Sequence, residues 1–330
     1  MNNRRIILLA SAAFICAPRI TFGQLARKVH RIGFLAAGAP SGAYHAQLLE
    51  AFRAGMRELG YVEGQTFAIE ARYADGHFER FPALVAELVQ MKVDVLVTAG
   101  GTPAVRAAQE ATRAIPIVAG SIADPVASGL VASLARPGGN ITGLTNFQID
   151  LGPKQLELLA TAVPKLSRIA VLVNPDNAIT GAVANNIASA ARKLGAEVQQ
   201  AKARSAEEID KAFATIASER AGACIIASDT FINTEFRRIA GLAAKNRLPC
   251  IGPYREYAEA GGLMSYGQNV IESYRRVASY VDKILKGTKP GDLPIEQPTR
   301  LDLVINLKTA KALGITIPNS ILVRADKVIE

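Results

Sequence analysis

The sequence predicts an α/β protein of two similar lobes, each a parallel sheet with helices on both faces. Three observations carry this prediction. Short apolar runs alternate with longer amphipathic segments, which is the pattern of buried parallel strands joined by helices. Four landmarks recur in the same order about 130 residues apart, so the second half repeats the first. Only 6% of the residues are aromatic and Trp is absent, so aliphatic residues dominate, as in parallel cores.

The repeat is clearest in the strand-like runs. RIGFL (31–35) corresponds to RIAVL (168–172), DVLVTAG (94–100) to ACIIASD (223–229), and AIPIVAG (114–120) to RLPCIGP (247–253). We expect helices over residues 43–59, 79–91, 103–113 and 125–136, and again over 178–194, 206–219, 231–246 and 254–260. Each half then reads β-α-β-α-β-α-β and forms a Rossmann-like, doubly wound lobe. Two such lobes place their strand-end loops, where ligands bind, across a shared cleft.

The first 23 residues have the anatomy of an export signal. Arg4 and Arg5 precede an apolar stretch over residues 6–17, and small residues lie near Gly23. We expect cleavage between Gly23 and Gln24 and export to the periplasm. The apolar stretch is short for a bilayer span, and an uncleaved membrane anchor is the alternative interpretation. The paired arginines also fit a twin-arginine signal.

Charge and composition narrow the function classes. The net charge is +9, and the signal contains three arginines and no acid, so +6 remains on the exported chain. Lys and Arg are dispersed, so no nucleic-acid partner is indicated. His30, His45 and His77 lack the spacing of metal ligands. Cys224 and Cys250 lie in strand-like runs, where buried thiols are favoured over a disulfide.

The segment VTAGGTPA (97–104) follows a predicted strand and begins a predicted helix. Thr102 and Pro103 favour a helix start, because Thr caps backbone N–H groups and Pro fits the first turn. Gly100 and Gly101 allow a sharp turn and a close approach by a ligand. The helix start then offers N–H donors to an anion. Neither Lys nor Arg stands in this segment, so we expect a carboxylate rather than a phosphate. The alternative is a tight turn without a ligand.

The other loops at strand ends carry hydroxyls, amides, carboxylates and tyrosines. That mixture suits a small polar molecule with an apolar or aromatic part. The candidates are Ser41, Tyr44, Ser121, Asp124, Asn174, Asp229, Thr230, Tyr254 and Tyr266. Helix capping is the alternative role for the aspartates and for Ser121. No nucleophile elbow, reactive cysteine or metal triad stands beside these loops, so we expect no catalytic residues, no cofactor and no enzyme.

Several longer passages carry a resemblance. They are RIGFL, FRAGMRELGYVEGQTFAIEARYADG, VTAGGTPAVRAA, SIADPVASGLVASLARPGGNITG and QPTRLDLVINLKTAKALGITIP. Across almost all of residues 29–330 the chain resembles the ABC-importer substrate-binding proteins of the tryptophan/tyrosine type. The resemblance implies the type I periplasmic binding protein fold, in which two lobes joined by three crossovers close on a ligand by a hinge. It also implies an ABC permease in the inner membrane with its ATPase as partner, and an amino acid or another small carboxylate as ligand. We expect a monomer.

Within that fold, the crossovers are expected at 140–150, 262–269 and 287–299. The amino-terminal lobe is then 29–143 plus 268–288, and the carboxy-terminal lobe is 144–267 plus 289–330. The final strand, LDLVIN, has no counterpart in the first half.

By position, the resemblance implies that a ligand carboxylate meets the Thr102 hydroxyl and the N–H groups after Gly101. Ser121 and Asp124 complete the amino-lobe side. Asn174, Asp229 and Thr230 close over the ligand from the other lobe, with Asp229 beside an ammonium group, and Tyr44, Tyr254 and Tyr266 supply apolar contacts.

Two other function classes share this fold. The first is a sensor ectodomain that reports to a membrane receptor, and the second is an enzyme that uses the same cleft. A cytoplasmic regulator of the lac-repressor kind would need DNA-binding helices before residue 30, where the export signal stands.

Overall fold

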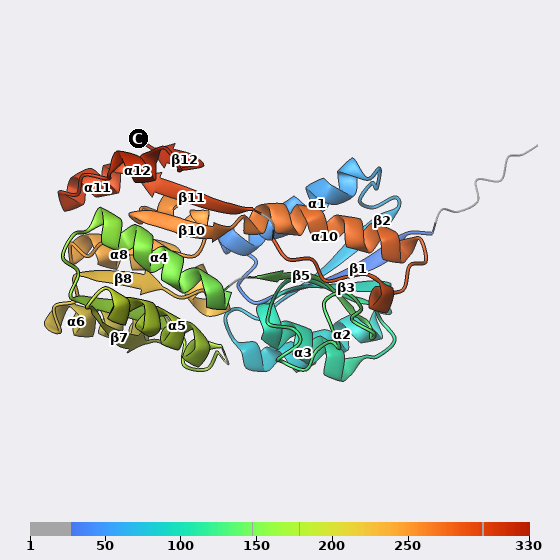
Figure 1. Cartoon of the computed structure of the whole chain (residues 1–330). Helices are drawn as coiled ribbons and strands as arrows, with labels where there is room; N and C mark the ends of the chain where they lie inside the picture. Colours follow the sequence, from blue (N-terminus) through green and yellow to red (C-terminus); the bar gives the residue numbers. More distant parts are fainter. Residues whose placement is uncertain (1–27, 147, 178, 299) are drawn as a thin grey trace, which may run out of the picture.

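The computed structural model describes residues 28–330 apart from 147, 178 and 299. The export signal predicted over residues 1–23 lies outside the described residues. The described chain forms two lobes side by side, each built around its own sheet, as Figure 1 shows. The predicted fold class, α/β with two doubly wound lobes, is confirmed.

The amino-terminal lobe contains a five-stranded sheet in the order β2-β1-β3-β4-β5. Its strands are β1 (His30–Ala36), β2 (Phe67–Tyr73), β3 (Val95–Ala99), β4 (Ile117–Ala123) and β5 (Ile141–Asn146). Every neighbouring pair is parallel. Along β1, Phe34 packs into one core and Leu35 into the other, so both faces of this sheet are buried.

Four helices cover the two faces of this sheet. They are α1 (Ala43–Glu58), α2 (Phe81–Gln90), α3 (Gly101–Ala111) and α10 (Val270–Leu285). Phe52 of α1 and Val277 of α10 share a core with Phe34, whereas Leu88 of α2 and Ala108 of α3 share the opposite core with Leu35. Helix α10 therefore completes the amino-terminal lobe although it comes from late in the chain, beside α1 in Figure 1.

The carboxy-terminal lobe contains a seven-stranded sheet in the order β12-β11-β10-β9-β8-β6-β7. Its strands are β6 (Arg168–Val173), β7 (Glu197–Lys202), β8 (Ala223–Ile226), β9 (Cys250–Gly252), β10 (Met264–Gln268), β11 (Leu301–Asn306) and β12 (Lys327–Ile329). All pairings are parallel except that of β10 with β11. The two lobes thus share a parallel centre, and the second lobe adds two strands at one edge.

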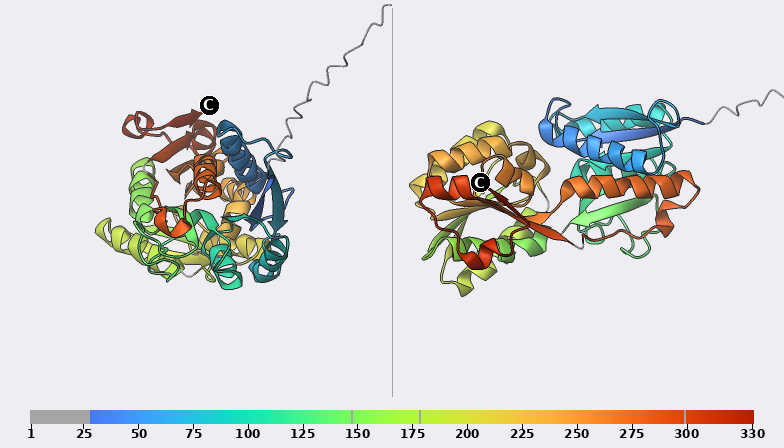
Figure 2. Two further views of the ribbon diagram at one scale, coloured as in Figure 1. Left: turned by 90° about the vertical axis from the view of Figure 1, so that its right-hand side faces the viewer. Right: turned by 90° about the horizontal axis from the view of Figure 1, so that it is seen from above.

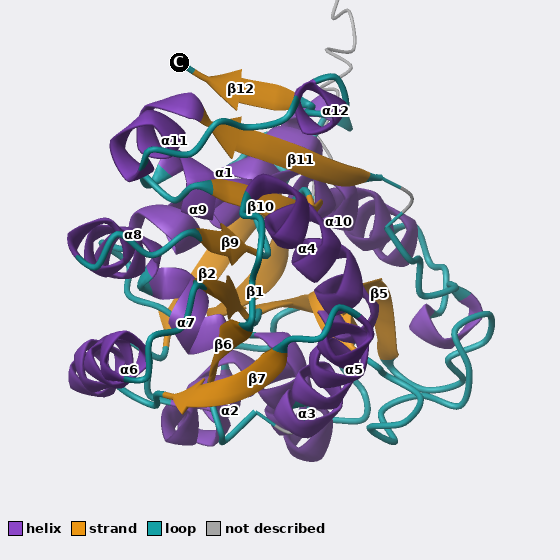
Figure 3. Cartoon of the chain, turned by 60° about the vertical axis from the view of Figure 1, so that its left-hand side comes forward, coloured by secondary structure: helices purple, strands orange, loops and turns teal. Residues whose placement is uncertain are grey.

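Helices also cover both faces of the second sheet, as Figure 3 shows. They are α4 (Gln148–Ala162), α5 (Thr180–Lys193), α6 (Ala206–Ser218), α7 (Thr230–Thr234), α8 (Phe236–Lys245), α9 (Arg255–Glu259), α11 (Leu307–Leu313) and α12 (Asn319–Leu322). Leu159 of α4 and Ile187 of α5 lie in one core, and Phe213 of α6 and Ile239 of α8 lie in the other. Among the described residues, no helix is both long and apolar enough to cross a membrane.

Three chain segments pass from one lobe to the other, and they lie in the narrow middle of the molecule in Figure 2. The first joins β5 to α4, the second joins β10 to α10, and the third runs from α10 through the short helix η2 (Pro290–Asp292) to β11. The strand β5 keeps residues as far as Asn146 in the amino-terminal sheet. The predicted lobe boundaries at 143/144 and 267/268 stay predictions.

Two predicted helices differ from the structure. Residues 125–136 form a single turn instead of a helix, because Gly129 adopts a left-handed backbone with φ of 70° that ends the turn. The Leu130 N–H donates back to the Pro125 carbonyl across that turn. The predicted helix over 231–246 divides into α7 and α8 at Glu235, whose φ of −98° and ψ of 10° interrupt the helix.

Candidate functional site

A cavity of about 630 Å³ lies between the lobes. Its lining comes from loops and helix starts that follow strands of both sheets, including β1, β3, β4 and β5 of the first sheet and β6, β8 and β9 of the second. A volume of this size suits a ligand of amino-acid to drug size. Among the described residues, no group of three or more His, Cys, Asp or Glu side chains could hold a metal ion.

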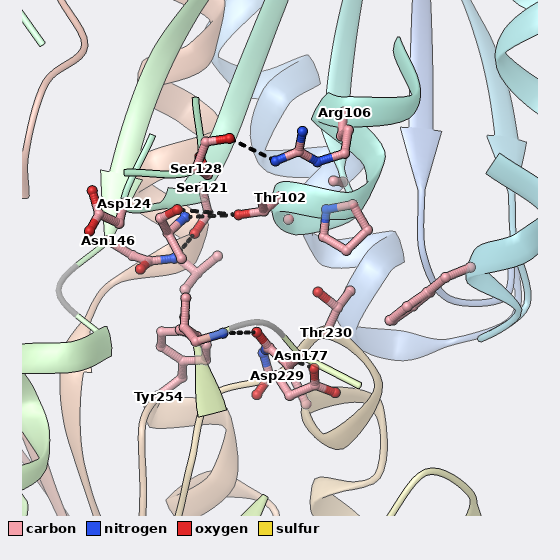
Figure 4. A pocket seen from close by; sticks show the side chains of 18 of the residues that line it. Thr102, Arg106, Ser121, Asp124, Ser128, Asn146, Asn177, Asp229, Thr230 and Tyr254 are labelled. Carbon is pink, nitrogen blue, oxygen red and sulfur yellow. Dashed lines mark hydrogen bonds between the residues drawn. The ribbon is translucent and has the colours of Figure 1, made fainter. Parts of the chain in front are cut away.

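The turn after β3 forms one wall of this cavity. Gly101 adopts φ of 62°, and α3 begins there, with Gly100 at the N-cap position and no side-chain cap. The sequence predicted Thr102 as the cap, and this prediction is wrong. The Thr102 hydroxyl instead accepts from the Ala123 N–H at 3.3 Å and donates to the Ala123 carbonyl at 3.4 Å, as Figure 4 shows. The start of α3 is therefore left without a side-chain cap, on the wall of the cavity.

The ends of β4 and β5 lie beside this turn. Asn146 Nδ2 donates to Ser121 Oγ at 2.8 Å, which fixes a hydroxyl and an amide together on the cavity wall. Asp124 adopts φ of 38° and accepts from the Ala127 N–H at 3.1 Å. Its carboxylate thus caps the single turn that replaces the predicted helix, while the residue also lines the cavity.

The opposite wall is centred on Asp229, whose side chain is buried. Its Oδ1 accepts from the N–H groups of Phe231 at 2.9 Å and Ile232 at 3.2 Å, which caps α7. The amides of Asn174 and Asn177 donate to the same carboxylate at 3.2 and 3.0 Å. No Lys, Arg or His among the described residues forms an ion pair with it. Asp229 is therefore a buried carboxylate held only by neutral donors.

Aromatic side chains close the deep end of the cavity. The Tyr254 hydroxyl accepts from Ser228 Oγ at 2.9 Å, and the Tyr274 hydroxyl donates to the Thr98 carbonyl at 3.0 Å. Tyr44 lines the same region from the start of α1. Burial raises the pKa of Tyr44 well above its usual value, with smaller contributions from nearby tyrosines and a glutamate. Burial raises the pKa of Tyr274 in the same way, so the phenols of Tyr44 and Tyr274 are neutral surfaces with one polar edge each.

The structure brings together eight of the eleven predicted site residues. Tyr44, Gly101, Thr102, Ser121, Asp124, Asp229, Thr230 and Tyr254 line the cavity. Three do not. Ser41 is exposed on the turn before α1, Asn174 is buried behind Asp229, and Tyr266 packs against the core of the carboxy-terminal lobe. Asn174 therefore positions a cavity residue instead of lining the cavity.

Sequence analysis missed several lining residues. Phe78 lies before α2, stacked on Phe81 with ring centroids 5.6 Å apart, and nothing in the sequence marked the loop after β2 as part of the cleft. Asn177 lies in the same loop after β6 as Asn174, but nothing in the sequence favours it as a lining residue. His45 was set aside because it lacks a metal-ligand pattern.

His45 connects two loops of the amino-terminal lobe. Its Nε2 accepts from the Gly38 N–H at 3.3 Å, and the ring is buried. Burial lowers the pKa of His45 to about 4, although a hydrogen bond with the Ala99 backbone opposes the shift. The ring is thus neutral near pH 7 and joins the loop after β1 to the end of β3, directly before Gly100.

Comparisons with known proteins show the family of this chain. The family model described as ABC transporter substrate binding protein matches residues 43–329. The chain belongs to this family. A curated tyrosine-binding protein of Clostridioides difficile is 27% identical over 263 residues, 79% of this chain and 75% of that protein. Members of this family bind small molecules for ABC transporters and are not enzymes, so the predicted family and its non-enzymatic class are supported.

Two solved structures are similar over nearly the whole chain. An ABC domain in complex with L-Trp from Streptococcus pneumonia has a TM-score of 0.83 and 26% identity, covering 92% of this chain and all of that one. A ligand-free, open substrate-binding protein from Clostridium difficile has a TM-score of 0.64 and 25% identity, covering 91% and 99%. Identity and coverage are nearly equal for the two structures, and the TM-score is higher for the L-Trp complex.

Proposed function

We propose that this protein is the extracytoplasmic solute-binding component of an ABC importer and that its ligand is an amino acid with an aromatic side chain. The observation that carries the proposal is Asp229, a buried carboxylate that has no basic partner within the described part of the chain. It lines one cavity together with the uncapped start of α3. One wall thus favours a positive group and the other a negative group. A zwitterion satisfies both.

The carboxylate of the ligand would bind at the start of α3. A helix start carries a partial positive charge and N–H groups that seek acceptors, and no side chain fills this role in α3. Thr102 and Ser121 lie beside it and offer hydroxyls. The ammonium group would bind at Asp229, whose Oδ2 accepts one hydrogen bond from Asn177 and has capacity for another.

Charge in the cavity argues against a phosphate. The lining contains the acids Asp124, Asp176 and Asp229 and one arginine, Arg106, whose guanidinium donates to the Ser128 carbonyl at 2.8 Å. His45 is neutral near pH 7 because its pKa is about 4. A dianion would meet more repulsion than attraction in this cavity, whereas the ammonium of an amino acid offsets the excess of acids.

The aromatic part of the ligand is supported by the lining and by the relatives. Tyr44, Phe78 and Tyr254 present ring surfaces to the cavity. One similar protein is named for tyrosine and another was crystallised with L-Trp. Aromatic rings pack favourably against such surfaces, by about 0.5–1.5 kcal/mol beyond the area that they bury.

Export and delivery complete the proposal. The export signal over residues 1–23 would send the chain to the periplasm, and the lobes would close on the ligand through the three crossovers. A sensor ectodomain would share this cleft. The two roles are separated by co-purification: an ABC permease as the bound membrane protein would support the importer, and a membrane receptor would support the sensor.

The ligand is tested with the exported chain beginning near Gln24. L-tyrosine, L-tryptophan and L-phenylalanine are compared with their deaminated acids and with sugar phosphates by calorimetry and thermal unfolding. We expect an aromatic amino acid to add about 2.7 kcal/mol of stability at 100 times its dissociation constant, and its deaminated acid to bind far more weakly. Stabilisation by sugar phosphates alone would refute the proposal.

A further inference from the structure

We propose that Gly101 and Thr230 form the contact at which the two lobes stop closing, so that Thr230 positions the lobes and is not primarily a ligand contact. The inference rests on the proposed function, because it concerns how the same cleft closes. Beside the cavity, Gly101 of the amino-terminal lobe and Thr230 of the carboxy-terminal lobe approach each other closely.

The space next to the Gly101 Cα is bounded by the opposite lobe. A Cβ atom built on Gly101 would lie 3.0 Å from Thr230 Oγ1, and the only other atom within 4 Å would be Cδ of Pro103 at 3.8 Å. A distance of 3.0 Å is tighter than real Cβ atoms usually allow. Apart from its chain neighbours, position 101 therefore meets no atom of its own lobe closer than 3.8 Å. The obstacle that adds to the strain of its left-handed backbone comes from across the cleft.

Thr230 is held firmly on its side. It is the first residue of α7 and follows Asp229, whose carboxylate accepts hydrogen bonds from two backbone N–H groups and from the amides of Asn174 and Asn177. Figure 4 shows Thr230 pointing from the carboxy-terminal lobe toward the start of α3, near Thr102. These hydrogen bonds fix the backbone at the start of α7, and thus the position from which the Thr230 side chain projects.

In this proposal the contact belongs to the closed arrangement of the lobes. This chain is more similar to the L-Trp complex than to the open, ligand-free structure, with TM-scores of 0.83 and 0.64. A methyl group at position 101 would stop the closing movement while the lobes are still farther apart. The amino-lobe donors and Asp229 would then not reach one ligand at the same time.

The first test compares two glycines that share a left-handed backbone. Gly101 has φ of 62° and Gly129 has φ of 70°, but a Cβ on Gly129 would meet nothing within 4 Å. Gly101→Ala should weaken binding of L-tyrosine or L-tryptophan at least tenfold and reduce the ligand-induced fall in the radius of gyration. Gly129→Ala should do neither. The double variant Gly101→Ala/Thr230→Ala should recover most of the affinity, because the obstructing hydroxyl is gone. Equal behaviour of the two single glycine variants, or no recovery in the double variant, would overturn the inference.

The second test needs no ligand, so it separates this inference from the proposed function. In a disulfide, each Cβ lies about 3 Å from the partner sulfur, which follows from the S–S bond length. The 3.0 Å approach matches that separation. Gly101→Cys/Thr230→Cys should therefore form a disulfide with copper-phenanthroline and lock the closed radius of gyration, whereas Gly129→Cys/Thr230→Cys should not.

If the first pair does not cross-link, the contact does not form in solution. If the wild-type chain binds no amino acid although this pair cross-links, the proposed ligand fails and the closure contact stands.

Discussion

The two lobes repeat one scaffold but present opposite chemistry to the cavity. In the amino-terminal lobe, β3 leads through Gly100 and Gly101 into α3, whose start has no side-chain cap. In the carboxy-terminal lobe, the corresponding β8 leads through Ser228 and Asp229 into α7, whose start is capped by the Asp229 carboxylate. The difference lies in the two residues of the turn.

Under the proposed function, that difference makes a duplicated fold suitable for an unsymmetrical ligand. A glycine turn brings the backbone close to the ligand and leaves N–H donors for a negative group. An aspartate in the same turn satisfies its own helix and turns a carboxylate oxygen toward the cleft. The sheets differ little at this point, so the polarity of the site is decided by loop residues and not by the fold.

The largest expected effect on ligand affinity comes from removing the charge of Asp229, on the cavity wall formed by the carboxy-terminal lobe. Asp229→Asn keeps a side chain that can cap α7 but loses the charge that the ammonium group would meet. We expect binding of an aromatic amino acid to weaken by about 4 kcal/mol, roughly a thousandfold. The thermal midpoint should also fall, because the amide nitrogen that replaces Oδ2 cannot accept from Asn177. Calorimetry measures the affinity.

Asp176→Asn is the matched control. Asp176 also lines the cavity but forms an ion pair with Arg204 at 3.1 Å. Its loss should change affinity less than fivefold. If both variants bind equally well, the two walls do not differ in the way proposed.

The second effect concerns His45 in the amino-terminal lobe. Its pKa is about 4 in the folded chain, against 6.5 for an ordinary histidine, so the unfolded chain binds more protons between these values. Stability should therefore fall as the pH drops from 6.5 to about 4, by about 1.4 kcal/mol per pH unit and about 3 kcal/mol in all. Denaturant unfolding at a series of pH values measures the slope.

His45→Gln isolates this contribution. The variant cannot titrate, so its stability curve should lose the slope that His45 gives the wild type in this window. An unchanged slope would mean that another group is responsible.

The third effect is a change of stability with pH that is opposite in sign to that of His45. It arises in the carboxy-terminal lobe. Both oxygens of Glu256 are buried without a hydrogen-bond partner among the described residues. Burial is the main cause that raises the pKa of Glu256 to about 7, so the folded chain keeps a proton that the unfolded chain loses above pH 4.5. This group should lower stability as the pH rises from 4.5 through 7.

Glu256→Gln should therefore stabilise the protein at pH 8, by about 2 kcal/mol, and have little effect at pH 4.5. Equal shifts at both pH values would indicate a packing effect instead. With His45, this result would assign a pH response of opposite sign to each lobe.

Much of the fold could be predicted because it depends on local patterns. Buried strands such as RIAVL and the repeat between the halves are visible in the sequence, and eight of the proposed site residues follow from where strands end. The single turn at 125–129 could not be predicted, because the segment has apolar residues at helical spacing and its end depends on the backbone of Gly129. The spacing of the apolar residues is visible in the sequence, whereas the φ angle of Gly129 is known only from the folded structure.

Other parts of the site depend on contacts between distant segments. Phe78 reaches the cavity only because the segment after β2 folds back beside α3, and His45 matters through the loops that it joins. Asn174 was placed near the ligand by its loop, but its amide is already used by Asp229. Loop position therefore predicts which residues gather near a cleft, whereas hydrogen bonds decide which of them remain available.

The smallest expected effect concerns Thr102, the residue that the sequence favoured most strongly on the amino-terminal wall. Its hydroxyl bridges the N–H and carbonyl groups of Ala123 at 3.3 and 3.4 Å, so a ligand must compete with two existing hydrogen bonds. Both distances are long, and the net contribution of such bonds is small. Thr102→Val should lower stability by about 0.5–1 kcal/mol and weaken ligand binding less than fivefold, because backbone donors at the start of α3 remain. Thr102→Ser keeps the hydroxyl and should behave like the wild type in calorimetry. A loss of affinity of a hundredfold or more in Thr102→Val would mean that the hydroxyl, and not the uncapped helix start, is what distinguishes this wall from the one formed by Asp229.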